Sequence, residues 1–172
     1  MDRNAGFTLV ELLVTIVVVI VLIGFIVPSY QKLIKNNRLT STANQMLGAM
    51  RYARSEAIIA KQRITLCKST DGAQCSQDGG YDQGWIIFQD AGVLASVDGS
   101  DQLLRVFHAA DDVSMFGNSS VSHYVSYVPS GEARLVSGGF QAGTIHICIG
   151  EAGRKLILSS TGRTRIEQDE CT

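Results

Sequence analysis

The chain contains none of the sequence patterns that most often mark an enzyme. Its 172 residues include no glycine-rich phosphate loop of the Walker type, no Gly-x-Ser-x-Gly nucleophile turn and no His-Glu-x-x-His zinc motif. The three histidines, His108, His123 and His146, lie far apart in the sequence, and we expect each to be an ordinary strand residue. We therefore predict a protein that is not an enzyme and that uses no cofactor.

Metal-binding patterns are missing as well. No Cys-x-x-Cys pair occurs, and no histidine stands at zinc-ligand spacing from a cysteine. Several aspartates could suggest calcium, but they lack the alternating oxygen ligands of a calcium loop, and aspartate near glycine is typical of turns. These residues are Asp98, Asp101, Asp111 and Asp112. We predict no metal site.

The overall charge identifies no class of partner. The net charge is −1, and 18% of the residues are charged. The distribution is more informative, because residues 30–64 include seven basic residues and a single acidic one, Glu56. Composition after residue 27 is that of one ordinary soluble domain with a single modest core.

A long apolar segment begins at Phe7 and ends at Val27, directly before Pro28. Its only ionisable side chain is Glu11. As an α-helix, at about 1.5 Å per residue, this segment would extend for roughly 30 Å, the thickness of the hydrocarbon core of a bilayer. The sequence therefore predicts a membrane-spanning helix over 7–27. A carboxylate inside such a helix is costly and marks a functional position that needs a partner when it is buried.

Two general explanations of this segment are incomplete. A signal peptide would end its apolar core at a small-x-small cleavage site, but here the core ends in Phe25, Ile26 and Val27. A plain transmembrane anchor accounts for the length, but not for Gly6-Phe7 followed by Glu11.

The string from Gly6 to Leu13, Gly-Phe-Thr-Leu-Val-Glu-Leu-Leu, resembles the prepilin leader of type IV pilins and type II secretion pseudopilins. The resemblance implies that residues 1–6 are a leader, that a prepilin peptidase cuts after Gly6, and that Phe7 is then N-methylated. It also implies that Glu11 pairs with the terminal amine of a neighbouring subunit during assembly. Pro28 falls where many members of the family carry a proline that bends the helix.

The charges that flank the apolar segment give a conflicting indication of topology. Lys32, Lys35 and Arg38 follow the segment, whereas only Arg3 precedes it, so a positive-inside count would place the C-terminal side in the cytoplasm. The resemblance implies the opposite, a single-pass inner-membrane protein with its C-terminal domain in the periplasm, which later enters a pilus or pseudopilus filament.

Four cysteines bear on the compartment, and they allow three disulfide connectivities. The favoured pairings are Cys67 with Cys75 and Cys148 with Cys171, and both imply an oxidising compartment. The alternative is four free buried thiols in a cytosolic protein. That alternative is weaker, because Cys171 would then lie on a frayed end.

After the apolar segment, helical periodicity continues over 28–62. Apolar residues recur at steps of three and four, which is typical of a narrow stripe that packs against a sheet. The stripe consists of Leu39, Ala43, Met46, Met50, Ala53 and Ala57. Gly24 and Pro28 are the weak points of the helix, where a kink is easiest.

From residue 63 onward the pattern changes from helical to alternating. Expected strands are separated by Gly, Asn, Ser and Asp. They lie at 64–67, 85–88, 103–107, 121–128, 144–149, 154–158 and 164–166. The predicted fold class is α+β, with a long N-terminal helix whose first half spans the membrane and whose second half packs on a C-terminal antiparallel β domain, 63–172, as in pilins.

Three motifs in this half resemble the GspH/FimT/FimU group of minor pilins and pseudopilins. They are Gly84-Trp-Ile-Ile-Phe88 followed by Asp90, the Pro129-Ser-Gly131 turn, and the closing hairpin Ser160-Thr-Gly-Arg163. The resemblance implies a minor pilin of a type IV pilus that acts in assembly or tip formation, with other pilin subunits as partners. The alternative is the H-type pseudopilin of a type II secretion system.

A further hypothesis concerns DNA. The sequence Gly162-Arg163-Thr164-Arg165 matches a Gly-Arg-x-Arg turn that the FimT branch of the group uses to bind double-stranded DNA during uptake in natural transformation. Arg154 and Lys155 on the preceding strand are expected within reach, and guanidinium groups suit phosphate oxygens. The alternative is that acidic residues neutralise this site. They are Glu167, Asp169 and Glu170.

Overall fold

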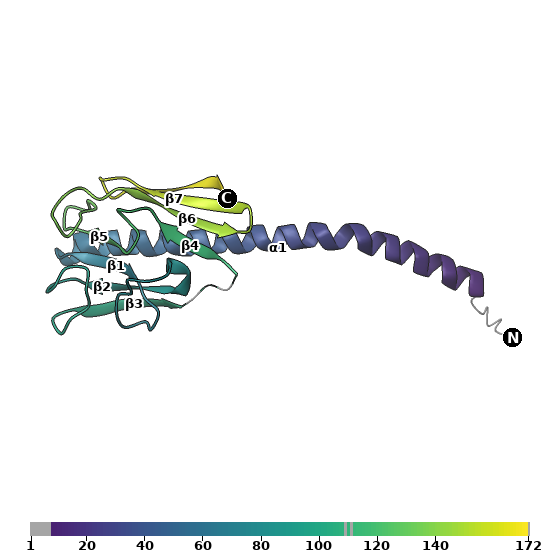
Figure 1. Cartoon of the computed structure of the whole chain (residues 1–172), viewed down its shortest axis with the longest axis horizontal. Helices are drawn as coiled ribbons and strands as arrows, with labels where there is room; N and C mark the ends of the chain where they lie inside the picture. The colour runs from purple at the N-terminus through teal and green to yellow at the C-terminus, as the bar shows by residue number, and fades with distance from the viewer. Residues whose placement is uncertain (1–7, 109, 111, 172) are drawn as a thin grey trace. The chain divides into compact units, whose positions relative to one another are not determined.

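The structure is a computed structural model that describes residues 8–108, 110 and 112–171, without the side chains of residues 24–29. It divides into two units, Met1–Asn37 and Arg38–Thr172. One helix, α1 (Leu9–Ala60), contributes to both units (Figure 1).

In the first unit the described apolar side chains of α1, from Leu9 to Ile23, are at least half exposed. No helix within the described residues is long and apolar enough to cross a membrane. The predicted spanning segment, 7–27, includes Phe7 and the side chains of 24–27, which lie outside the described residues. The predicted leader 1–6 and the side chain of Pro28 lie outside them too.

In the described part of the second unit, the β domain consists of two antiparallel sheets of four strands each. Sheet A has the order β3-β2-β1-β5, and sheet B has the order β4-β6-β7-β8. The strands of sheet A are β1 (Ile64–Lys68), β2 (Gly84–Gln89), β3 (Gln102–His108) and β5 (Tyr124–Tyr127). The strands of sheet B are β4 (Ser114–Gly117), β6 (Gly143–Ile149), β7 (Ala152–Leu158) and β8 (Thr164–Glu170). A short 3-10 helix, η1 (Tyr81–Gln83), precedes β2.

The core forms where α1 meets both sheets. All six residues of the predicted stripe are buried, from Leu39 to Ala57, each with at most 1% of its surface exposed. They share one apolar cluster with Trp85 of sheet A and Leu156 of sheet B. In Figure 1 the two sheets accordingly lie on either side of the C-terminal part of the helix. The predicted α+β fold is confirmed, and the stripe is what holds the sheets together.

The expected strands differ from the structure mainly at three places. Of the strand expected at 121–128, only β5 (Tyr124–Tyr127) is formed. β4 was not expected, because it has only four residues, of which Met115 alone is buried. β8 continues to Glu170 although the predicted strand ended at 166, because its pairing with β7 extends as far as Ala152 opposite Glu170. The polar composition of 167–170 gives no strand signal, and these residues are extended because they pair with β7.

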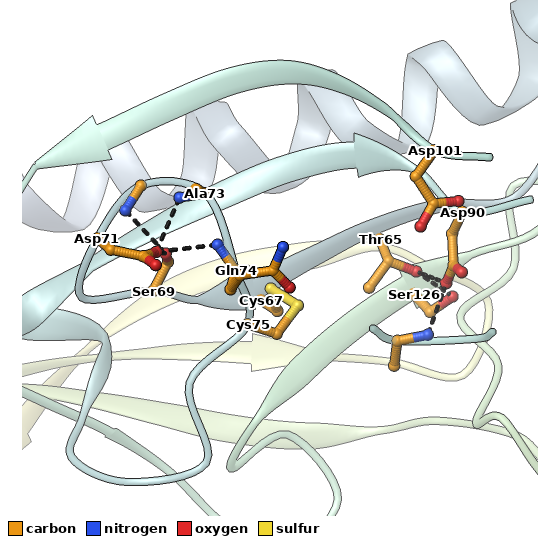
Figure 2. Close-up of a disulfide and its surroundings, with 12 residues drawn as sticks. Thr65, Cys67, Ser69, Asp71, Ala73, Gln74, Cys75, Asp90, Asp101 and Ser126 are labelled. Carbon is orange, nitrogen blue, oxygen red and sulfur yellow. Dashed lines mark hydrogen bonds between the residues drawn. A yellow bond between two sulfur atoms is a disulfide. The ribbon is translucent and has the colours of Figure 1, made fainter. Parts of the chain in front are cut away.

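A smaller cluster lies on the other face of sheet A, away from the helix. It contains Cys67, Ile86 and Phe88. Beside it a buried polar network joins three strands or their ends: the Thr65 hydroxyl donates to Asp90, and Thr65 Oγ1 lies 2.9 Å from Ser126 Oγ (Figure 2). Burial raises the pKa of the Asp90 carboxyl above its usual range. Asp90, which follows the Gly84–Phe88 motif, therefore has a structural role here.

Candidate functional site

The start of α1 is closed by a reciprocal pair of side chains. The backbone N–H of Thr8 donates to Glu11 Oε2 at 3.0 Å, and the backbone N–H of Glu11 donates to Thr8 Oγ1 at 3.2 Å. The Thr8 hydroxyl also donates to Glu11 Oε2 at 2.9 Å. This is a capping box, which satisfies two N–H groups that the helix itself leaves unpaired.

Sequence reasoning missed the capping box, although the Thr-x-x-Glu spacing at 8–11 was a signal for it. The pairing of Glu11 with a neighbour's amine stays a prediction. The processing residues Gly6 and Phe7 lie outside the described residues.

Both disulfides predicted from the sequence are present. Cys67 is bonded to Cys75, with 5.6 Å between the two Cα atoms, and Cys148 to Cys171, with 6.0 Å. The second bridge passes over β7 at Gly153. A Cβ at that position would overlap Cys171 Sγ, so the bridge requires a glycine there. Together the bridges favour an oxidising compartment.

The turn at Pro129-Ser-Gly131 and the hairpin tip at Ser160-Thr-Gly-Arg163 form one structure. The backbone N–H of Ala133 donates to the carbonyl of Ser160 at 3.2 Å. Arg54, on α1, donates to the carbonyl of Gly131 at 2.8 Å and to the carbonyl of Thr161 at 3.0 Å. Arg54 therefore fixes both turns to the helix, a role that its place in a basic stretch of sequence did not indicate.

Gly162 is the closest point of this contact. Its φ of +78° lies in the left-handed region, and a Cβ there would overlap the carbonyl oxygen of Gly131. Only glycine meets both requirements. The contact explains why residue 162 is a glycine.

The four basic residues proposed to bind DNA do not all lie on one face. Lys155 pairs with Glu167 and Ile157 with Arg165 in the β7–β8 ladder, which places Lys155 and Arg165 on the same side of sheet B. Arg154 alternates with Lys155, so it lies on the side of the buried Leu156. Of the two residues expected within reach of the arginines, Lys155 shares a face of sheet B with Arg165 and Arg154 does not. The role of all four residues in DNA binding stays a prediction.

Carboxylates partly neutralise this face. Arg165 Nε donates to Glu167 Oε1 at 2.7 Å. Lys155 Nζ lies 4.0 Å from Glu167 Oε2 and 3.8 Å from Asp169 Oδ1. The hydrogen bond from Arg165 holds the pKa of the Glu167 carboxyl below its usual range, so this carboxyl is ionised at neutral pH. Arg163 is exposed and has no carboxylate partner within the described residues.

The same face carries a contact that the sequence did not reveal. His146 Nδ1 lies 2.5 Å from Asp169 Oδ2, and the imidazole stacks on Phe116 with ring centroids 5.2 Å apart. His146 and Asp169 meet because β6 and β8 both pair with β7. No sequence motif or residue spacing predicts this contact. No group of three acidic, histidine or cysteine side chains in the described residues is arranged to hold a metal ion.

Two family models match the chain. The model described as type II transport protein GspH matches residues 42–162. The prokaryotic N-terminal methylation motif matches residues 1–27. No curated protein is similar enough to count as a match.

Solved structures give the same indication. In two crystal forms, the type IV minor pilin FimU of Pseudomonas aeruginosa is similar with TM-scores of 0.57 and 0.56. The identities are 23% and 27%, the matches cover 77% and 75% of this chain, and they cover 90% and 92% of FimU. The minor pseudopilin EpsH of Vibrio cholerae has a TM-score of 0.52 and 11% identity, over 76% of this chain and 97% of EpsH.

The methylation motif implies processing by prepilin peptidase, anchoring in the inner membrane and incorporation into a filament with other pilin subunits. The GspH model covers more than half of the chain, and the fold agrees with it. The chain therefore belongs to the GspH family and is a structural, non-enzymatic filament subunit, a minor pilin or pseudopilin of a type IV pilus or a type II secretion system.

Proposed function

We propose that the protein is a minor pilin of a type IV pilus and acts in pilus assembly or tip formation. The observation that carries this proposal is the likeness to FimU, with 27% identity over 92% of that chain. The likeness to the pseudopilin EpsH, at 11% identity, concerns the fold alone. The H-type pseudopilin of a type II secretion system is the alternative.

In the proposed mechanism the peptidase cuts after Gly6 and Phe7 is methylated. The apolar helix then leaves the bilayer and packs among the helices of other subunits. There Glu11 meets a neighbour's terminal amine, so that a desolvated carboxylate gains an opposite charge. The β domain stays on the filament surface, where its disulfides suit the periplasm and the exterior.

Deleting the gene in its own host tests the assignment. We expect the amount of pili in the sheared surface fraction to fall at least severalfold, with type II secretion of exported enzymes unchanged, and a plasmid copy to restore pili. Normal pili together with a loss of secretion would reverse the assignment in favour of the pseudopilin.

DNA binding is a second candidate, supported by one specific observation. Arg163 is exposed at a hairpin tip that Arg54 holds rigidly, and it lacks a carboxylate partner within the described residues. Arg165 and Lys155, in contrast, lie beside Glu167. A phosphate contact of this hairpin would therefore be made mainly by Arg163, through charge rather than base recognition.

This second candidate predicts unequal effects of neighbouring substitutions. In titrations of the detergent-solubilised full chain with duplex DNA over a salt series, Arg163→Ala should make the log–log salt slope shallower by about 0.9. Glu167→Gln should raise the affinity, because it removes the charge that neutralises Arg165. Arg51→Ala, an exposed arginine on α1, is the matched control. If Arg51→Ala and Arg163→Ala weaken binding equally, the hairpin is not a DNA site.

A further inference from the structure

The two sheets of the β domain have four outer edges, and two of them are covered by other parts of the chain. At β5, the backbone N–H of Arg134 donates to the carbonyl of Ser126 at 2.9 Å, and Tyr127 bridges to Ala133. At β4, the backbone N–H of Met115 donates to Asp82 Oδ1 of η1 at 3.0 Å. Other segments of the chain therefore already form hydrogen bonds with both of these edges.

The third edge, β8, is protected by charge. Four of its seven residues are charged, namely Arg165, Glu167, Asp169 and Glu170. Charged side chains along an edge strand are a common device that prevents pairing with another chain. The edge of β8 is therefore an unfavourable place for strand addition.

Within the described residues, no other segment forms a backbone hydrogen bond to the fourth edge, β3, although Gly72 lies against the Val106 side chain. Figure 1 shows β3 as the outermost strand of sheet A. Its sequence, Gln-Leu-Leu-Arg-Val-Phe-His, contains no acidic residue. The single arginine, Arg105, lies over the ring of Tyr52 on α1, 4.2 Å from the centroid. Leu103 and Val106 are 42% and 38% exposed.

The pairing of β2 shows which backbone groups of β3 are open. The N–H of Asp90 donates to the carbonyl of Arg63, and the N–H of Ser69 to the carbonyl of Gly84, so the even-numbered residues of β2 bond to β1. The backbone groups of Trp85 and Ile87 therefore point toward β3 and form hydrogen bonds with their partners Phe107 and Arg105.

Val106 lies between these two partners, so its N–H and C=O point away from β2 to the outer side. No hydrogen bond within the described residues occupies that side of Val106. The strand is also held firmly, because Phe107 stacks on the buried Trp85 with 5.1 Å between ring centroids. The outer side of β3 thus has an open backbone donor and acceptor at Val106, on a strand that is held in place.

We propose that this edge binds an extended segment of a neighbouring pilin-fold subunit, which adds a strand to sheet A beside β3. Only an extended chain matches the spacing of an open strand edge, and apolar side chains such as Leu103 and Val106 give such a contact its specificity. The neighbouring subunit is the occupant because family membership makes other pilin subunits the partners of this chain. The proposal rests on that membership and holds for a pilus or a pseudopilus.

The experiment uses the full chain in its host, with a photoreactive residue placed by Leu103→benzoylphenylalanine. After irradiation we expect a cross-link to an extended segment of another pilin-fold subunit, identified by peptide mass spectrometry. In this background Val106→Pro should reduce the cross-link at least tenfold, because proline lacks the outward N–H while the edge position tolerates it. Val106→Thr, which keeps the N–H and the branched shape, should retain the cross-link.

Val106→Lys is the second variant if Val106→Pro fails to fold, since a lysine on the edge blocks strand addition without removing a backbone group. A cross-link that survives in folded Val106→Pro or Val106→Lys protein would overturn the proposal, and so would a cross-link that maps to a helix or to another class of protein. Absence of any cross-link in parent protein recovered from filaments would overturn the edge proposal alone. Absence of the parent protein from both kinds of filament would refute its role as a filament subunit.

Discussion

Gly162→Ala should lower the free energy of unfolding by about 2–4 kcal/mol. An alanine at a φ of +78° costs about 1–2 kcal/mol by itself. The new Cβ would also overlap the carbonyl oxygen of Gly131, which forces apart the two turns that Arg54 and the Ala133–Ser160 hydrogen bond hold together. Each hydrogen bond weakened in this way adds about 1 kcal/mol to the loss.

Urea unfolding of the full chain in detergent, with disulfides intact, measures this loss. Trp85, the single tryptophan, is buried and reports on the core. Gly150→Ala is the matched control, because Gly150 has a φ of +60° but nothing within 4 Å of its Cβ position. We expect the control to lose only about 1–2 kcal/mol. Equal losses for both variants would show that the contact between the two turns contributes nothing.

Glu11→Ala and Glu11→Gln should both reduce incorporation into filaments at least tenfold, with cleavage after Gly6 intact. In the proposed assembly the Glu11 carboxylate is buried among helices and pairs with a neighbour's terminal amine. Either substitution removes the carboxylate charge and leaves that amine buried and unpaired, which costs several kcal/mol. The two variants differ in the capping box, because glutamine can still accept the hydrogen bond from Thr8 whereas alanine cannot. The fraction of the chain in sheared filaments, relative to the membrane, measures the effect.

Thr8→Ala is the control for the glutamate variants. It removes the hydroxyl partner of Glu11 and keeps the charge, so we expect it to assemble within about twofold of the parent, in line with a capping loss of about 1 kcal/mol in a helix that packing also supports. Normal assembly of Glu11→Gln together with failure of Glu11→Ala would show that Glu11 acts as a helix cap and not as a charge partner.

Much of the fold could be predicted because local patterns determined it. The stripe from Leu39 to Ala57 has helical spacing and is buried as expected. The strands around Trp85 and Ile147 have apolar runs that no helix pattern explains. β4 and the end of β8 could not be predicted, since a neighbouring strand rather than their own composition makes them extended.

The candidate site was predictable in its residue types but not in its contacts. Glycine and arginine at 162–165 indicated a hairpin with two cations. That Glu167 pairs with Arg165, and that Arg54 binds both turns from the helix, depends on residues brought together over separations that no local pattern encodes. Tertiary structure thus decides how much of the positive charge is available to a ligand.

The Cys148–Cys171 bridge has a consequence for strand exchange between subunits. It joins Cys148, near the end of β6, to Cys171, directly after β8, so β7 and β8 lie within a covalently closed loop of residues 148–171. A strand in such a loop cannot be donated to another molecule unless the bridge is first reduced. While the disulfide is intact, β8 therefore stays in its own subunit, and this protein cannot form a domain-swapped dimer by exchanging β8.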